Sequence, residues 1–264
     1  MRAHLMTRGT PRALDYDFLG ASPDRWWRSL DDRELVVLEE PVVLAKSADG
    51  SMGMLLSGLP SSRRDVLGTR IRHTLVVDGL ESDPELAGRL AATALDPAGR
   101  HRLGKELDGL LPVETVEAVL SGDADGAEIP VLLERLLTSA DWAEDAGGEA
   151  GGQSADREGS WAAPLDDPAG RAAFLARIAA LARGREGIAF VSHSLTSLAG
   201  AAGAAAELPG DTAVLLADGE VGGVVALGKG VDAAAERTRP GVPLTTGLIA
   251  AALIALIALV ILLL

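Results

Sequence analysis

The sequence predicts an α/β (or α+β) fold in which two parts of the chain build one mixed sheet, followed by a single transmembrane helix. The first part is a β-rich segment from Arg33 to Leu80, and the second is a strand–helix–strand unit within residues 166–228. A helical region separates them, and residues 245–264 carry no charge. These three observations define the expected architecture.

The β-rich segment contains three runs of aliphatic and β-branched residues, ELVVLEEPVVLAK, SMGMLLSGL and RIRHTLVVDGL. The turn formers ADGS and LPSS separate the runs, which is typical of strands joined by short turns. Ahead of them, SPDRWWRSL favours a short helix, because Ser22 suits the N-cap and Pro23 suits the first helical position.

The hydrophobic period changes after Asp83. The stretches DPELAGRLAATAL, DPAGRHRLGKELDGLL and IPVLLERLLTS carry leucines at helical spacing and begin at or near a proline. Asp83 and Asp96 precede two of these prolines and are suitable caps. The sequence therefore predicts a run of helices up to about Ser139.

The next segment, residues 141–165, is acidic and rich in glycine, so we expect a disordered loop there. A helix is expected after Asp167 and Pro168, ending near Gly184. The runs GIAFVSH, DTAVLLAD and GGVVALG then have strand composition, with the helical LTSLAGAAGAAAEL between the first two. This order favours a right-handed parallel crossover.

The crossover is too short for a comfortable core of its own. We therefore expect residues 1–140 and 166–228 to form one domain with a shared core, and two small lobes are the alternative. Residues 229–244 are expected to link this domain to the membrane segment.

The composition bounds the function. The formal net charge is −14, and residues 81–170 carry 20 acidic against 6 basic side chains. A nucleic-acid-binding protein needs a basic surface, so we expect no nucleic-acid partner. The chain has no cysteine, which excludes disulfides, thiolate metal sites and a thiol nucleophile. Its four histidines are scattered without metal-ligand spacing, and no metal or other cofactor is expected.

The end of the sequence predicts a location. Gly247 to Leu264 is an uncharged helix-forming stretch of roughly 27 Å, close to the hydrocarbon thickness of a bilayer. The first twenty residues lack the apolar run of a signal peptide. Lys229, Arg237 and Arg239 flank the stretch on one side. We therefore expect a single-pass tail anchor in a bacterial inner membrane, through residues 245–264, with the preceding domain in the cytoplasm.

Four arginines form the first candidate site. Arg63, Arg64, Arg70 and Arg72 fall within ten residues, and they suit a phosphate, an acidic partner or lipid head groups. Strand alternation places Arg70, Arg72 and Thr74 on one face, with His73 on the buried face beside Ile71. The alternative is that these arginines pair with acidic residues of the chain itself.

The second candidate is the sequence FVSHSLTSLAG. Ser192, His193 and Ser194 follow a predicted strand and precede a helix, where open α/β sheets bind ligands. Ser192 and His193 are weak catalytic candidates because adjacent side chains on an extended backbone point apart, and no nucleophile-elbow pattern is present. The simpler interpretation makes Ser194 the helix cap and leaves His193 at the surface. The functional alternative makes Ser192 and Ser194 contacts to a ligand or partner.

Two functional hypotheses follow. The first is a membrane-tethered binding, adaptor or regulatory module with a protein partner at the inner membrane face, because no complete catalytic set is visible. The second is a membrane-tethered hydrolase or transferase that uses the Ser192–Ser194 loop.

Overall fold

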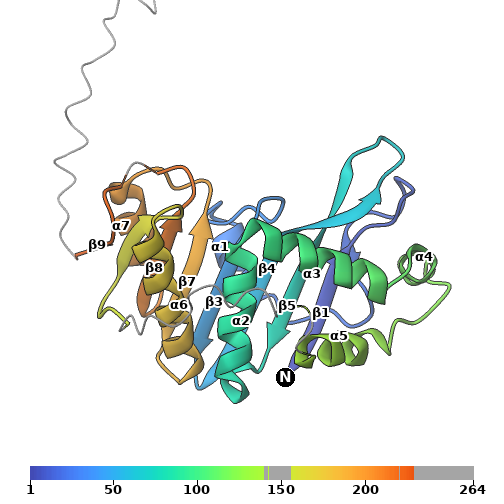
Figure 1. Cartoon of the computed structure of the whole chain (residues 1–264), viewed down its shortest axis with the longest axis horizontal. Coiled ribbons are helices and arrows are strands. Elements are labelled where there is room, and N and C mark those ends of the chain that lie inside the picture. Colours follow the sequence, from blue (N-terminus) through green and yellow to red (C-terminus); the bar gives the residue numbers. More distant parts are fainter. Residues whose placement is uncertain (140–141, 143–155, 220, 229–264) are drawn as a thin grey trace, which may run out of the picture. The chain divides into compact units, whose positions relative to one another are not determined.

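The computed structural model describes residues 1–139, 142, 156–219 and 221–228, and these form a nine-stranded mixed sheet with helices on both faces (Figure 1). The strand order is β2-β1-β5-β4-β3-β7-β8-β6-β9. β8 lies parallel to both β7 and β6, and the remaining neighbours are antiparallel. The predicted mixed α/β fold is confirmed.

The strands are short at both edges of the sheet and longest in the β4–β5 hairpin. Their bounds are β1 Arg2–Thr7, β2 Asp17–Phe18, β3 Val43–Ala48, β4 Ser51–Arg64, β5 Arg70–Asp78, β6 Trp161–Pro164, β7 Gly187–Ser192, β8 Asp211–Leu216 and β9 Val225–Ala226.

The helices begin largely where the capping residues predict. Asp83, Asp96 and Asp167 each accept hydrogen bonds from backbone N–H groups of the first turn that follows. The bounds are α1 Arg28–Asp31, α2 Pro84–Leu95, α3 Pro97–Leu110, α4 Val113–Ser121, α5 Ile129–Thr138, α6 Pro168–Ala182 and α7 Leu198–Glu207, with a 3₁₀ turn at Leu80–Ser82.

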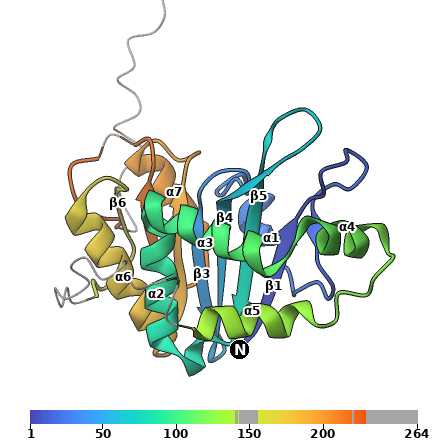
Figure 2. The same cartoon turned by 45° about the vertical axis from the view of Figure 1, so that its right-hand side comes forward.

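Two hydrophobic clusters lie on opposite faces of the sheet. Helices α2, α3, α5 and α6 cover one face of the sheet (Figure 2). Their apolar side chains belong to one cluster, and those of α1 and α7 belong to the other. Strand β7 shows the alternation, since Ala189 and Val191 belong to the first cluster and Ile188 and Phe190 to the second. The central strands are therefore buried on both faces.

The N-terminal and C-terminal halves of the sheet join at one strand pair. β3 pairs with β7 from Leu44↔Phe190 to Ser47↔Gly187. The β-rich segment and the crossover thus share one sheet, and the described residues form one compact unit.

Three local predictions were wrong. The LPSS stretch is not a turn but part of β4, where Pro60 is tolerated because the strand is bulged and lies beyond the end of β3. The first helix does not start at Ser22 and Pro23. It is α1, which begins after Trp27 without a side-chain cap.

The third correction concerns the expected loop at residues 141–165. Trp161–Pro164 is strand β6, and Asp156 accepts a 2.8 Å hydrogen bond from the buried Arg177. The strand depends on pairing with β8, which is distant in sequence, and the Asp156 contact depends on a buried arginine of α6. Residues 143–155 of the expected loop lie outside the described residues, as do the predicted linker 229–244 and the predicted span 245–264. Within the described part of the chain, none of the helices is both long and apolar enough to traverse a bilayer.

Helix α3 packs unusually close to β4. A Cβ atom at Gly104 would lie 2.2 Å from the carbonyl oxygen of Pro60. We expect Gly104→Ala to lower the free energy of unfolding by about 1–3 kcal/mol, because backbone must move to accommodate the methyl group. Gly109 on the same helix has no atom within 4 Å of its ideal Cβ, so Gly109→Ala is the matched control. Urea unfolding of both variants checks this, and equal effects would contradict it.

Candidate functional site

The structure separates the four candidate arginines. Arg63 turns toward the helices, where its Nε donates to Asp108 at 3.2 Å. Arg64 donates to the carbonyl oxygen of Gly68 in the hairpin turn at 2.6 Å. Arg70 and Arg72 line a pocket on the other face of the sheet. The predicted alternation is confirmed, because Ile71 and His73 are buried and Arg70 is exposed.

The pocket lies where β4 and β5 extend past the end of β3. Its volume is about 720 Å³. It is bounded by the end of β1, the β1–β2 loop, the segment 38–41, both strands of the hairpin and the start of α3. The residues are Met6, Arg8, Tyr16, Leu38, Glu39, Glu40, Pro41, Gly58, Pro60, Thr69, Arg70, Arg72, Thr74, Pro97 and Arg100.

Two of the four arginines in this pocket are already engaged. Arg8 lies 3.5 Å from the carboxylate of Asp65 and stacks over the ring of Tyr16, with 5.6 Å from its guanidinium carbon to the ring centroid. Arg100 donates to the carbonyl oxygen of Ala94 at 2.7 Å, and burial lowers the pKa of Arg100.

The guanidinium groups of Arg70 and Arg72 form neither a hydrogen bond nor an ion pair with any other residue that the structure describes. The backbone N–H of Arg72 donates to the hydroxyl of Tyr16 at 3.2 Å, which positions the tyrosine at the pocket. The guanidinium groups of Arg70 and Arg72 are therefore available as cationic donors to a ligand in the pocket. Arginine donors of this kind match the oxygens of a phosphate or a carboxylate.

A smaller hollow of about 300 Å³ adjoins the pocket and shares Met6, Tyr16, Leu38 and Thr74 with it. Its other side is mixed in charge, with Asp31 and Asp32 on or beside α1 next to Arg25 and Arg28. Burial, then the charges of Asp32 and Glu39, raise the pKa of Asp31.

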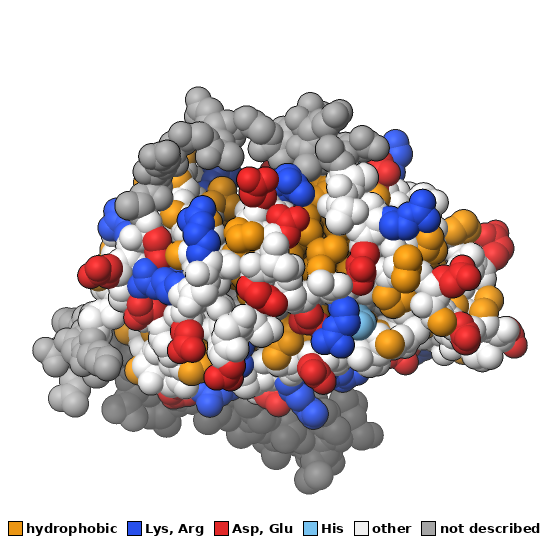
Figure 3. Space-filling view, turned by 90° about the horizontal axis from the view of Figure 1, so that it is seen from below, with side chains coloured by type: hydrophobic (Ala, Val, Ile, Leu, Met, Phe, Trp, Pro, Cys, Tyr) orange, Lys and Arg blue, Asp and Glu red, His pale blue; other side chains and the backbone are white. Residues whose placement is uncertain are grey.

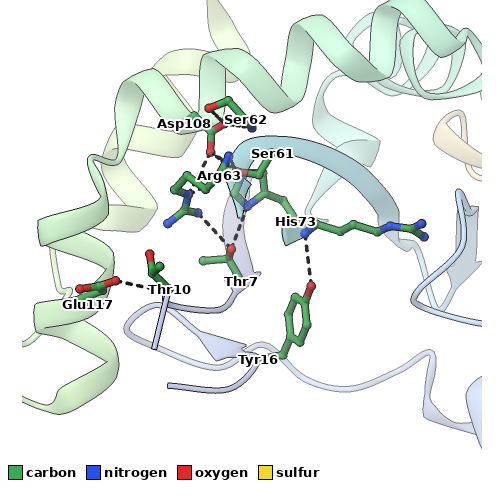
Figure 4. A network of polar contacts seen from close by, with 10 residues as sticks. Thr7, Thr10, Tyr16, Ser61, Ser62, Arg63, His73, Asp108 and Glu117 are labelled. Atoms are coloured by element: carbon green, nitrogen blue, oxygen red, sulfur yellow. Dashed lines mark hydrogen bonds and ion pairs between the residues drawn. The ribbon is translucent and has the colours of Figure 1, made fainter. Parts of the chain in front are cut away.

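The buried polar network on the helix side of the hairpin is centred on the carboxylate of Asp108, in α3 (Figure 4). Oδ1 accepts from Ser61 at 2.6 Å, His73 at 3.0 Å and Arg63 at 3.2 Å. Oδ2 accepts from the backbone N–H and the hydroxyl of Ser62, at 2.6 and 2.7 Å. One side chain thus joins α3 to both strands of the hairpin.

The network determines the tautomer of His73. A carboxylate only accepts, so Nε2 of His73 carries the proton that is donated to Asp108. Nδ1 lies 3.0 Å from the hydroxyl of Thr7 and accepts its proton, while that oxygen accepts from Arg63 at 3.2 Å. Thr7, His73 and Asp108 have the residue types of a catalytic triad, but Thr7 and His73 are fully buried. The arrangement is therefore structural.

The same contacts shift two pKa values. Burial lowers the pKa of His73, and its hydrogen bond to Asp108 only partly opposes this. Burial acts to raise the pKa of Asp108, but the hydrogen bonds from His73, Ser61 and Ser62 outweigh it and hold that pKa well below its usual range. In the folded protein, His73 is thus neutral and Asp108 is negatively charged.

The second candidate site connects β7 to the segment 34–41. Ser192 is fully buried; its hydroxyl donates to the carbonyl oxygen of Leu35 at 2.7 Å and accepts from the backbone N–H of Leu195 at 3.1 Å. Nε2 of His193 lies 3.1 Å from the carbonyl oxygen of Pro41, and Nδ1 lies 3.9 Å from Asp218. Among the described contacts there is none between the Ser192 hydroxyl and the His193 ring.

Ser194 also binds this segment, since its hydroxyl donates to the carbonyl oxygen of Glu34. It is not the helix cap that the sequence predicted. Ser197 caps α7 by accepting from the backbone N–H of Gly200 at 3.1 Å, because the chain needs three more residues to turn from β7 into the helix.

The two candidate sites meet at the segment 34–41. Glu39, Glu40 and Pro41 line the pocket, and the ring of His193 contacts the carbonyl oxygen of Pro41. Gly58 permits this arrangement, because its φ is +65° and a Cβ there would lie 2.6 Å from the nitrogen of Pro41. Sequence reasoning missed the lining residues Arg8 and Tyr16, from the β1–β2 loop, and Arg100, from the distant helix α3, because they share no local motif.

Comparison with protein-family models, with curated proteins and with solved structures found no match. Over the described ranges, no group of three or more histidine, aspartate or glutamate side chains is arranged to hold a metal ion.

Acidification below about pH 6.5 is expected to destabilise the fold, because an unfolded histidine binds a proton there that the buried His73 does not. The slope contributed by this group approaches about 1.4 kcal/mol per pH unit. Asp108 adds a further loss only below about pH 4, since its folded pKa lies below its unfolded value.

Urea unfolding between pH 7 and pH 5 measures this effect. His73→Gln should be less stable at pH 7 and show a flatter pH dependence. His101→Gln, at an exposed position of α3, is the control that keeps the wild-type slope. Equal slopes for His73→Gln and the wild type would refute the assignment.

Proposed function

We propose that the chain is a single-pass membrane protein whose α/β domain is a binding or adaptor module at the inner face of a bacterial membrane. The observation that carries this proposal is the pair Arg70 and Arg72, which lines a pocket of about 720 Å³ without an acidic partner in the described part of the chain. The ligand class is an anionic group, either on a small molecule or on an acidic protein partner.

The geometry supports an anion rather than an apolar ligand. Arg70 and Arg72 are two positions apart in β5, so their side chains leave the strand on the same face. Two adjacent guanidinium groups bind one phosphate or carboxylate with several charge-assisted hydrogen bonds. Tyr16 closes one side of the pocket, and Glu39 and Glu40 on another side disfavour anions that bind away from the arginines.

The tether is supported by the sequence. Gly247 to Leu264 is uncharged, and Lys229, Arg237 and Arg239 precede it. Basic residues on one flank favour the cytoplasmic side for that flank. An extended chain with the length of residues 229–244 reaches roughly 50 Å, so the tether leaves the domain many orientations.

The alternative, a hydrolase or transferase at the Ser192–Ser194 loop, has less support. A serine nucleophile needs a base within hydrogen-bonding distance and access to substrate. The Ser192 hydroxyl is buried and shared between Leu35 and Leu195, and the His193 ring faces Pro41 and Asp218. The loop is better suited to support the pocket wall.

Anion binding is expected to raise the melting temperature of the full chain when inorganic phosphate or pyrophosphate is added, at constant ionic strength. Arg70→Ala and Arg72→Ala should each lower the affinity for the anion roughly tenfold, because each removes charge-assisted hydrogen bonds. Each variant should therefore need a correspondingly higher anion concentration for the same rise in melting temperature. Arg64→Ala is the matched control, since Arg64 donates to Gly68 in the turn and does not line the pocket. Identical responses from all three variants would count against the pocket.

The membrane anchor is tested separately. The full chain should sediment with membranes and resist carbonate extraction, whereas a chain ending at Pro240 should stay in the supernatant. A full-length chain that carbonate releases would disprove the anchor and leave the pocket proposal standing.

A further inference from the structure

The β4–β5 hairpin projects beyond its neighbours in the sheet. β3 pairs with β4 no further than Leu56, and β1 pairs with β5 no further than Thr74. Beyond these residues, and up to the pair Arg64↔Arg70, the strands pair only with one another among the described residues. The hairpin therefore forms a two-stranded arm at one end of the domain (Figure 1).

The tip of this arm exposes apolar side chains. Val66 is 63% exposed and Leu67 is 75% exposed. In the described part of the chain, four large apolar side chains are exposed, and Tyr16 at the same end is a third member of that group. Exposed apolar side chains gathered at one end indicate a contact surface.

The tip is held in a defined conformation. Oδ1 of Asp65 accepts from the backbone N–H groups of Leu67 and Thr69, both at 2.9 Å, and Gly68 takes a φ of +79°. The backbone N–H of Val66 donates to the carbonyl oxygen of Thr10, at 3.2 Å, which fixes the β1–β2 loop beside the tip. The apolar pair is thus presented on a preorganised turn.

The two segments that form this end, residues 8–16 and 62–72, carry more basic than acidic side chains, although the net charge of the chain is −14. Glu39 and Glu40 line the pocket beside them, and Glu117 accepts from the backbone N–H of Thr10. Residues 8–16 and 62–72 contain Arg8, Arg12, Arg63, Arg64, Arg70 and Arg72, against Asp15 and Asp65. Arg8 and Arg63 pair with Asp65 and Asp108. The other four arginines have no ion pair with any described residue.

The opposite end of the domain differs. Figure 3 views the molecule from the end remote from the hairpin tip, and basic and acidic side chains are interspersed over the described surface there. Three of the four large exposed apolar side chains of the described residues, Tyr16, Val66 and Leu67, lie at the hairpin end, beside arginines without an ion pair.

We propose that the hairpin tip docks on the anionic surface of the lipid bilayer. Val66 and Leu67 insert into the interface, and Arg12 and Arg64 contact lipid phosphates. Apolar side chains on a rigid turn with flanking basic residues have the chemistry that binds such a surface. The inference rests on the proposed tether for the nearness of a bilayer, and it adds an orientation that the tether leaves open.

A bilayer fits this surface better than a protein partner. A stable protein interface buries about 800 Å² on each side, with aromatic anchors at its centre. The tip offers two aliphatic side chains on a narrow arm, whereas a lipid surface needs only a small apolar insertion and cationic contacts. The acidic remainder of the domain would be repelled by anionic lipid, so the cationic end is the one that faces it.

The absence of cysteine makes the test direct. The full chain carries Thr69→Cys, labelled with a polarity-sensitive fluorophore next to the tip, in nanodiscs of phosphatidylcholine alone or mixed with phosphatidylglycerol. The emission should shift to shorter wavelength only in the anionic discs. Val131→Cys on α5, which is 58% exposed, is the control position and should give the same emission in both lipids.

Two double variants separate the contributions. Arg12→Gln with Arg64→Gln should lower the docked-to-undocked ratio roughly 25-fold, about fivefold for each arginine. Val66→Ser with Leu67→Ser should abolish the shift, and unchanged melting temperatures should show that both variants are folded. Equal emission in the two lipids, or a shift that survives the loss of both arginines, would overturn the proposal.

Failure of the anchor gives a different result. A chain that does not enter nanodiscs is mixed with vesicles of the same two compositions. A shift with anionic vesicles then supports docking while the anchor fails, and no shift overturns docking as well. Arg70 and Arg72 are unchanged throughout; because Thr69 lines the pocket, anion binding there is measured on the unlabelled chain.

Discussion

The carboxylate of Asp108 is the contact on which the hairpin end of the molecule depends. It accepts five hydrogen bonds from Ser61, Ser62, Arg63 and His73, and so joins α3 to β4 and β5. A buried anion is tolerated only when its hydrogen bonds are satisfied. Because the hairpin has no other strand partners beyond Leu56 and Thr74 in the described sheet, this network sets its direction. The positions of the pocket and of the hairpin tip depend on that direction, because the hairpin forms part of both.

Much of the architecture could be predicted from the sequence. Helix starts at Asp83, Asp96 and Asp167 follow from capping chemistry, and the β7–α7–β8 order predicts parallel pairing. These signals are local. The pairing of β3 with β7 and the recruitment of Trp161–Pro164 into the sheet depend on partners far along the chain, for which one sequence carries no signal.

The candidate site was predictable only in part. Strand alternation placed Arg70 and Arg72 on one face and His73 on the other, as the structure shows. The position of Arg63 could not be predicted, because the bulged β4 turns it toward Asp108, 45 residues away in sequence. The Ser192–Ser194 loop looked like an independent site, yet its hydroxyl and imidazole groups bind the segment 34–41 that lines the pocket. One segment thus relates two features that the sequence presents separately.

The pairing of β3 with β7 affects how the chain folds during its synthesis. Leu44 pairs with Phe190, and these residues are 146 positions apart (190 − 44). A ribosome that adds about 5–20 residues per second needs roughly 7 to 30 s to make that length of chain. During this time the β1–β5 half of the sheet has its long-range partner missing, and the apolar strand β3 forms an open edge. Unpaired apolar edges are where nascent chains aggregate, so we expect this edge to be the part of the sheet most prone to aggregation during synthesis.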